Sequence, residues 1–96
     1  MFIEIKGLKT EYTECGEGIP VLLLHGWGSS FDVYKGIMAS LKKRCRLVAV
    51  NFPGCGQSET MATPWCLEDY CDFCLEFMEK LNLKDPIMIG HSHGGR

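Results

Sequence analysis

Three short runs of aliphatic residues, each followed by a turn that contains glycine, dominate the hydrophobic pattern of this chain. The runs are Val21–Leu24, Leu47–Val50 and Pro86–Ile89. Unbroken aliphatic runs of this length are typical of strands that are buried on both faces in a parallel sheet. The sequence therefore predicts three central strands of this kind.

Two segments between these runs have the periodicity of amphipathic helices. In the first, Ser29 and Asp32 predict a helix start, and the apolar face that follows consists of Tyr34, Ile37, Met38 and Leu41. In the second, the apolar stripe consists of Leu67, Tyr70, Cys71, Cys74, Phe77, Met78 and Leu81. A strand–helix–strand–helix–strand order predicts a parallel sheet with crossover helices.

Residues 1–15 have a different pattern, in which polar and apolar residues alternate. Ile3 and Ile5 fall on one face, and a turn is expected at Lys6-Gly7-Leu8. This predicts an antiparallel hairpin at the edge of the sheet. The fold class is therefore α/β, with an antiparallel edge hairpin followed by parallel strands.

Composition and charge narrow the function classes. The chain has 96 residues, of which 46% are hydrophobic and 23% charged, and its net charge is −2. This balance is that of a globular protein and argues against nucleic-acid binding. No stretch has the length of a membrane span, and the first residues lack the pattern of a secretion signal. We therefore expect a cytoplasmic protein that binds neither nucleic acid nor membrane.

Six cysteines raise the question of disulfides or a zinc site. Thiols stay reduced in the cytosol, and no second C-x-x-C completes a zinc ligand set. Cys71 and Cys74 fall on the predicted apolar stripe of the second helix. We expect both to be small core residues, and we expect no metal.

The last aliphatic run leads directly into Gly90-His91-Ser92-His93-Gly94. A G-x-S-x-G sequence after a buried strand is typical of a nucleophile elbow, a strained turn that exposes a serine. Glycine at both flanking positions removes the side chains that would clash there. The alternative is an ordinary Gly/Ser-rich turn.

The other two runs also end in turns that contain glycine. They are His25-Gly26-Trp27-Gly28 and, after the second strand, residues 51–58 with Gly54, Gly56 and Ser58. Together with the elbow, these turns resemble the α/β-hydrolase family on its serine-nucleophile branch. Asn51 stands where that family usually has Asp, and an amide can still bond the loop backbone. The resemblance covers nearly the whole chain and implies that residues 1–96 are the N-terminal part of one such domain, ending just after the elbow.

The resemblance implies a role for each candidate site residue. Ser92 would be the nucleophile, and the backbone amides of Trp27 and His93 would form the oxyanion hole. His25, Gly26, Gly90 and Gly94 would support these turns, and His91 and His93 are not expected to act as the base. The acid and the catalytic histidine would follow Ser92, outside this chain. Trp27 and Phe52 are candidate substrate contacts, although packing is an equal alternative for each.

The function implied by the resemblance is that of a serine hydrolase acting on a small ester, thioester or amide through an acyl-enzyme, without a cofactor. A same-fold lyase using the same serine, and a non-catalytic truncated scaffold, remain alternatives. The family's epoxide hydrolases and haloalkane dehalogenases carry aspartate at the position of Ser92, which argues against those branches. A phosphate loop is not expected, because no Gly-Lys-Ser or Gly-Lys-Thr sequence is present. The chain by itself is expected to be inactive and poorly soluble.

Overall fold

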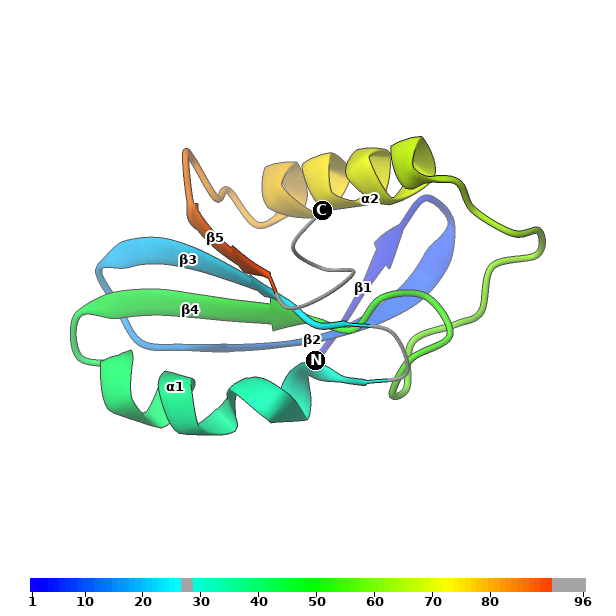
Figure 1. Ribbon diagram of the computed structural model, residues 1–96. Helices are drawn as coiled ribbons and strands as arrows, with labels where there is room; N and C mark the ends of the chain where they lie inside the picture. The colour runs from blue at the N-terminus through cyan, green and yellow to red at the C-terminus, as the bar shows by residue number, and fades with distance from the viewer. Residues whose placement is uncertain (27–28, 91–96) are drawn as a thin grey trace.

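The structure is a computed structural model that describes residues 1–26 and 29–90. Figure 1 shows a twisted sheet with one helix on each side. Its strands are β1 (Phe2–Ile5), β2 (Leu8–Cys15), β3 (Ile19–Leu24), β4 (Cys45–Val50) and β5 (Ile87–Gly90). Its helices are the short 3₁₀ helix η1 (Phe31–Tyr34), α1 (Lys35–Leu41) and α2 (Leu67–Lys80).

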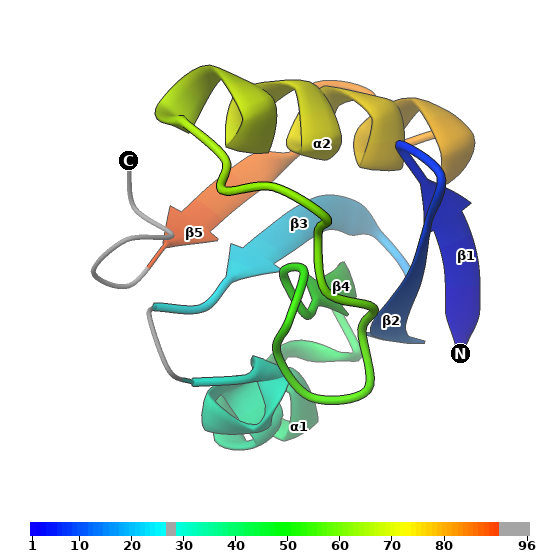
Figure 2. The ribbon, with the colours of Figure 1, turned by 90° about the vertical axis from the view of Figure 1, so that its right-hand side faces the viewer.

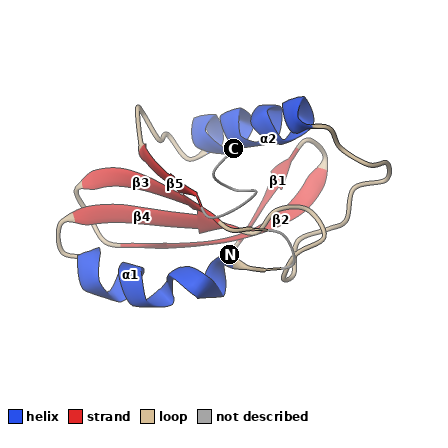
Figure 3. Ribbon diagram, in the orientation of Figure 1, coloured by secondary structure: helices blue, strands red, loops and turns tan. Residues whose placement is uncertain are grey.

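The strands form one mixed sheet in the order β1-β2-β4-β3-β5 (Figure 3). β4, β3 and β5 are parallel neighbours, whereas β2 is antiparallel to both β1 and β4. β2 pairs with β1 through Glu11 and with β4 from Tyr12 onward, so it joins the edge hairpin to the parallel core. The predicted α/β class, the edge hairpin and the parallel pairing of the three strands are confirmed. The expected burial on both faces holds for β3 and β4 but was wrong for β5, which lies at the edge of the described sheet with Ile87 and Met88 exposed.

The edge hairpin turns at the predicted place. Lys6 and Gly7 both have positive φ, at 51° and 76°. Two such residues form the tight turn whose twist matches that of the flanking strands. The turn sets the register of the hairpin. In this register Ile5 is fully buried in the core between the sheet and α2.

Alternate residues of the parallel strands face two separate cores. The core beneath α2 takes the even-numbered positions of β3 and β4, which are Leu22, Leu24, Val48 and Val50. The core beneath α1 takes the odd-numbered positions, which are Val21, Leu23, Leu47 and Ala49. Figure 2 shows the two helices on opposite faces of the sheet. Burial on both faces explains why these strands are aliphatic without interruption.

The buried stripe of α2 is formed by Tyr70, Phe73 and Phe77. The predicted stripe was wrong at two positions, because Cys71 and Leu67 are exposed, and it omitted Phe73. Successive helical residues are about 100° apart, so Cys71 lies about 140° around the helix from a face centred between Phe73 and Phe77, on the side away from the sheet.

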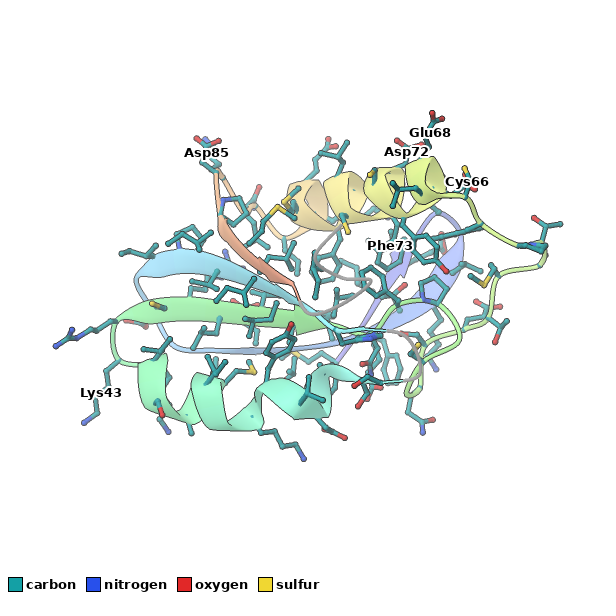
Figure 4. The ribbon with its side chains drawn as sticks, in the orientation of Figure 1. Lys43, Cys66, Glu68, Asp72, Phe73 and Asp85 are labelled. Carbon is teal, nitrogen blue, oxygen red and sulfur yellow. The ribbon has the colours of Figure 1, made fainter. Side chains whose placement is uncertain are left out.

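Figure 4 shows how α2 is oriented on the sheet. Phe73 lies on the side that faces the sheet, and Glu68 and Asp72 lie on the outer side. The helix begins after Cys66, whose amide donates to Asp69 Oδ2 at 2.9 Å. This capping bond and the weaker one from the Cys66 thiol hold the pKa of Asp69 below its ordinary value.

The first helical segment begins one residue later than predicted. Ser30, and not Ser29, caps it, because the Asp32 amide donates to Ser30 Oγ at 3.3 Å. The segment starts as a 3₁₀ turn, and only Tyr34 and Met38 of the predicted face are buried. Ile37 and Leu41 are exposed, since this short helix places a single ridge of side chains on the sheet.

Candidate functional site

The three parallel strands end side by side at one edge of the sheet. Leu24, the last residue of β3, pairs with Val50 of β4 and with Gly90 of β5. The chain therefore leaves all three strands at the same level, toward the viewer in Figure 2. Ligands bind at this carboxyl edge in open α/β sheets, so it is the candidate site.

His25 lies beneath this edge and connects two of the strand ends. Its side chain is 1% exposed, and its Nδ1 is 2.8 Å from the carbonyl oxygen of Gly26. The amide of Phe52 donates to His25 Nε2 at 3.0 Å. Because Nε2 accepts this bond, the proton of the neutral ring lies on Nδ1, which donates to Gly26. These contacts are those of a residue that supports the loop, and they leave neither nitrogen directed at a substrate.

The described part of the 25–28 loop is anchored at both ends. Gly26 is buried, and its carbonyl oxygen also accepts a bond from the Ser29 amide at 3.3 Å. The Tyr34 hydroxyl donates to the carbonyl of Leu24, the residue before this loop, at 2.6 Å. Burial raises the pKa of the Tyr34 hydroxyl, which keeps it a donor.

The predicted reactive groups lie outside the described residues. These are Ser92 with its neighbours His91, His93 and Gly94, and Trp27 in the first loop. The nucleophile and the two oxyanion-hole amides therefore stay predictions. Gly90 is described as the last residue of β5, so the predicted elbow does follow directly on a strand.

Phe52 is packed into the core beneath the site. Its side chain is 5% exposed, and its ring centroid lies 5.0 Å from that of His25 and 5.6 Å from that of Tyr70. Both pairs have edge-to-face geometry, which is the favourable one for aromatic rings. These contacts agree with a packing role for Phe52, and contact between Phe52 and a substrate stays a prediction.

The turn after β4 depends on glycine and on one serine. Gly54 and Gly56 have φ of 82° and 51°, a region that side chains rarely adopt. Ser58 is buried and donates its hydroxyl to the Asn51 carbonyl at 2.8 Å. These three residues shape the turn beside the site, as their sequence positions predict.

Asn51 fills the position where aspartate is usual in the resembled family. Its Oδ1 accepts a bond from the Phe31 amide at 2.8 Å, so the amide does bond the neighbouring loop. Its Nδ2 donates to Glu11 Oε1 at 2.8 Å. Sequence reasoning did not identify Glu11. The feature of the sequence that could have pointed to Glu11 is Asn51, because an amide in place of the usual carboxylate suggests that another segment supplies the carboxylate.

The described residues contain neither a cluster of metal ligands nor a membrane-spanning helix. In residues 1–26 and 29–90, no group of three or more His, Cys, Asp or Glu side chains is placed to hold a metal ion. Over the same ranges, no helix has both the length and the apolar character needed to cross a bilayer.

Comparison with known proteins identifies the family. The family model described as alpha/beta hydrolase fold matches residues 19–96. The chain is 34% identical over 83 residues to the (E)-2-((N-methylformamido)methylene)succinate hydrolase of Acinetobacter baylyi, covering 86% of this chain and 32% of that protein. It is 33% identical over 76 residues to "Putative esterase/lipase 2" of Mycoplasma pneumoniae, covering 77% and 28%.

Solved structures give the same result. The Cif epoxide hydrolase from Acinetobacter nosocomialis superimposes with a TM-score of 0.88 at 30% identity, covering 96% of this chain and 29% of that one. The chain spans about a third of the length of the curated relatives it matches. The family match includes all three parallel strands and the turns that follow them. The chain belongs to the alpha/beta hydrolase fold family.

Proposed function

We propose that these residues form part of a serine hydrolase that cleaves small ester, thioester or amide substrates through an acyl-enzyme. The observation that carries the proposal is the common level at which β3, β4 and β5 end. It brings the start of the His25-Gly26 loop and the start of the G-x-S-x-G sequence to one edge of the sheet. A nucleophile and an oxyanion hole need this proximity.

In the proposed mechanism, Ser92 attacks the carbonyl carbon of the substrate. The amides of Trp27 and His93 donate to the developing oxyanion, and each such donor contributes about 10²–10³ in rate. A histidine takes the serine proton and is oriented by an acidic residue. His25 does not suit the role of this base, because both of its ring nitrogens are engaged with the backbone. The proposal places the acid and the base in residues beyond this sequence.

Support for hydrolysis comes from the relatives. One is named as a hydrolase of an N-methylformamido succinate derivative, and another is named with the words esterase and lipase. The epoxide hydrolase shares the fold at similar identity. Serine at position 92 favours acyl transfer over epoxide opening in the resembled family, where the epoxide branch uses aspartate.

Location in the cytoplasm is also a proposal. All six cysteines lie within the described residues and all are free thiols. Free thiols at this density are typical of proteins in a reducing compartment. The partner we propose is a small acyl substrate, and the net charge of −2 favours neither nucleic acid nor an anionic surface.

The test uses a fluorophosphonate probe on the full-length protein that contains these residues. We expect the probe to modify Ser92, as identified by peptide mass spectrometry, and Ser92→Ala to abolish both labelling and cleavage of p-nitrophenyl acetate. A folded protein that hydrolyses this ester without labelling at Ser92 would overturn the proposal. Turnover of styrene oxide in place of the ester would favour the epoxide branch instead.

A further inference from the structure

We propose that Glu11 is a positioning residue of this site, and that it acts through Asn51. Glu11 lies on β2, where it pairs with Phe2 of β1 at the end of the edge hairpin. Asn51 lies directly after β4 and contacts the segment that follows the 25–28 loop. The geometry rests on the described residues alone. Its relevance to catalysis rests on the proposed function of that loop.

The contacts form a continuous path from β2 to η1. Glu11 Oε1 accepts one bond from Asn51 Nδ2 and one from the Gln57 amide, each at 2.8 Å. The other end of the Asn51 side chain accepts from the Phe31 amide, also at 2.8 Å. Asn51 is 1% exposed, so the two bonds of its side chain are partly shielded from water, whereas the Gln57 bond lies at the surface. One carboxylate therefore fixes the turn after β4 directly and the start of η1 through a single side chain.

The two ends of Asn51 require an amide and exclude a carboxylate. The Phe31 amide needs an acceptor, and the Glu11 carboxylate needs a donor. Aspartate at position 51 would place a second carboxylate oxygen about 2.8 Å from the first. Two such groups cannot both ionise at that separation without a large penalty. Glu11 and Asn51 are therefore a matched pair, in which β2 supplies the acceptor oxygen and position 51 supplies the amide donor.

The surrounding backbone holds this pair in place. The Asn51 amide donates to the Glu11 carbonyl at 2.9 Å, and the Glu11 amide donates to Ser58 Oγ at 2.8 Å. A Cβ atom at Gly56 would lie 2.1 Å from Asn51 Nδ2 and 2.9 Å from Glu11 Oε1. Glycine is thus required at position 56 for close approach as well as for its positive φ.

The test measures hydrogen exchange at single amides by NMR in the full-length protein, without substrate. We expect Glu11→Ala to accelerate exchange of the Phe31 and Gln57 amides at least about tenfold, because their bonding path is cut. The amides of Val21–Leu24 in β3 should change much less. Glu11→Gln should restore most of the protection, since its amide oxygen can still accept.

Glu14→Gln is the matched control, because Glu14 is also on β2 but pairs with Arg46. It should leave exchange at Phe31 unchanged. Asn51→Asp should accelerate Phe31 exchange, and Asn51→Asp combined with Glu11→Gln should slow it again, because the glutamine can donate to the aspartate. Asn51→Asp and its combination with Glu11→Gln test the proposal even if Glu11→Ala fails to fold.

Two results would overturn the proposal. One is unchanged exchange at Phe31 in both Glu11→Ala and Asn51→Asp. The other is acceleration to the same extent at Phe31 and throughout β3, which is the signature of global destabilisation alone. The exchange measurements do not depend on catalysis. The positioning role of Glu11 can therefore be refuted while the probe still labels Ser92, and it can be supported even if the probe does not label Ser92.

Discussion

The imidazole of His25 joins the end of β3 to the residue that follows Asn51, because its Nε2 accepts a hydrogen bond from the Phe52 amide at 3.0 Å. The two residues are far apart in sequence but lie at the ends of adjacent parallel strands. Their rings are also packed edge to face. A histidine beside a candidate active site is thereby used to support the backbone of two loops.

The first prediction concerns this bridge. His25→Ala removes the acceptor of the Phe52 amide and the donor to Gly26, both in a buried environment. We expect the free energy of unfolding to fall by about 2–4 kcal/mol, measured by urea denaturation. Ser40→Ala is the control, because it removes an exposed side-chain bond in α1 and should cost less than about 0.5 kcal/mol. An effect of His25→Ala no larger than that of the control would contradict the bridging role.

Local patterns in the sequence predicted the parallel core, and the structure shows why. Residues such as Leu22 and Val48 are buried because each strand is covered on both faces, and this burial requires aliphatic residues at successive positions. The helix faces were predicted less well. Periodicity gives the width of an apolar stripe, but the sheet decides where it is centred on the helix, and the observed centre buries Phe73 and leaves Cys71 exposed.

The contacts of the site could be predicted only in part. The turn residues Gly54 and Gly56 are visible in sequence because backbone conformation is a local property. The bond between Glu11 and Asn51 is not, since it joins segments 40 residues apart and depends on strand register. Nothing local to Glu11 distinguishes it from Glu14, three residues further along the same strand.

The second prediction compares two positions on α2. Phe73 is fully buried between the rings of Phe52 and Trp65, whereas Leu75 is 60% exposed. We expect Phe73→Ala to lower the free energy of unfolding by about 3–5 kcal/mol through lost burial and the cavity it leaves. Leu75→Ala on the same helix should change it by less than about 0.5 kcal/mol. Equal effects in urea denaturation would place the buried stripe elsewhere.

The third prediction concerns thiol reactivity. Burial, with a smaller effect from neighbouring Cys71, raises the pKa of Cys74 to about 12. Since the thiolate is the nucleophile, roughly one Cys74 in ten thousand is reactive at pH 8. We expect iodoacetamide to modify the exposed Cys66 and Cys71 rapidly and Cys74 only after unfolding, as read by peptide mass spectrometry. Modification of Cys74 at the rate of Cys71 in the native state would show that α2 packs differently.

The fourth prediction follows from the same shift at alkaline pH. The folded-state pKa of Cys74 lies above its ordinary value of 9.0, so the unfolded chain loses the proton first. Stability is therefore complete below pH 9 and falls as the pH rises toward 12. At about 1.5 pH units above the ordinary value, this loss is on the order of 2 kcal/mol.

Urea denaturation at several alkaline pH values measures this loss. Cys74→Val should flatten part of the decline, and the remainder is expected from Tyr34, Tyr70 and Cys55, whose pKa values burial also raises. Cys66→Val is the control, because that thiol is exposed and should leave the slope unchanged. A wild-type slope that survives Cys74→Val in full would assign the alkaline loss to other groups.

The last prediction concerns the free edge of the sheet. Among residues 1–26 and 29–90, β5 pairs only with β3, and its Ile87 and Met88 are 53% and 50% exposed. A flat apolar edge strand with unpaired backbone groups is a template for association with another chain. We expect the 96-residue chain to self-associate at micromolar concentration in sedimentation velocity experiments, and Met88→Lys to shift it toward the monomer, because a buried lysine opposes edge-to-edge pairing. Val33→Lys adds the same charge at an equally exposed apolar position on η1, away from that edge, and should leave the association unchanged. If both lysine variants reduce association alike, net charge and not the edge of β5 controls it.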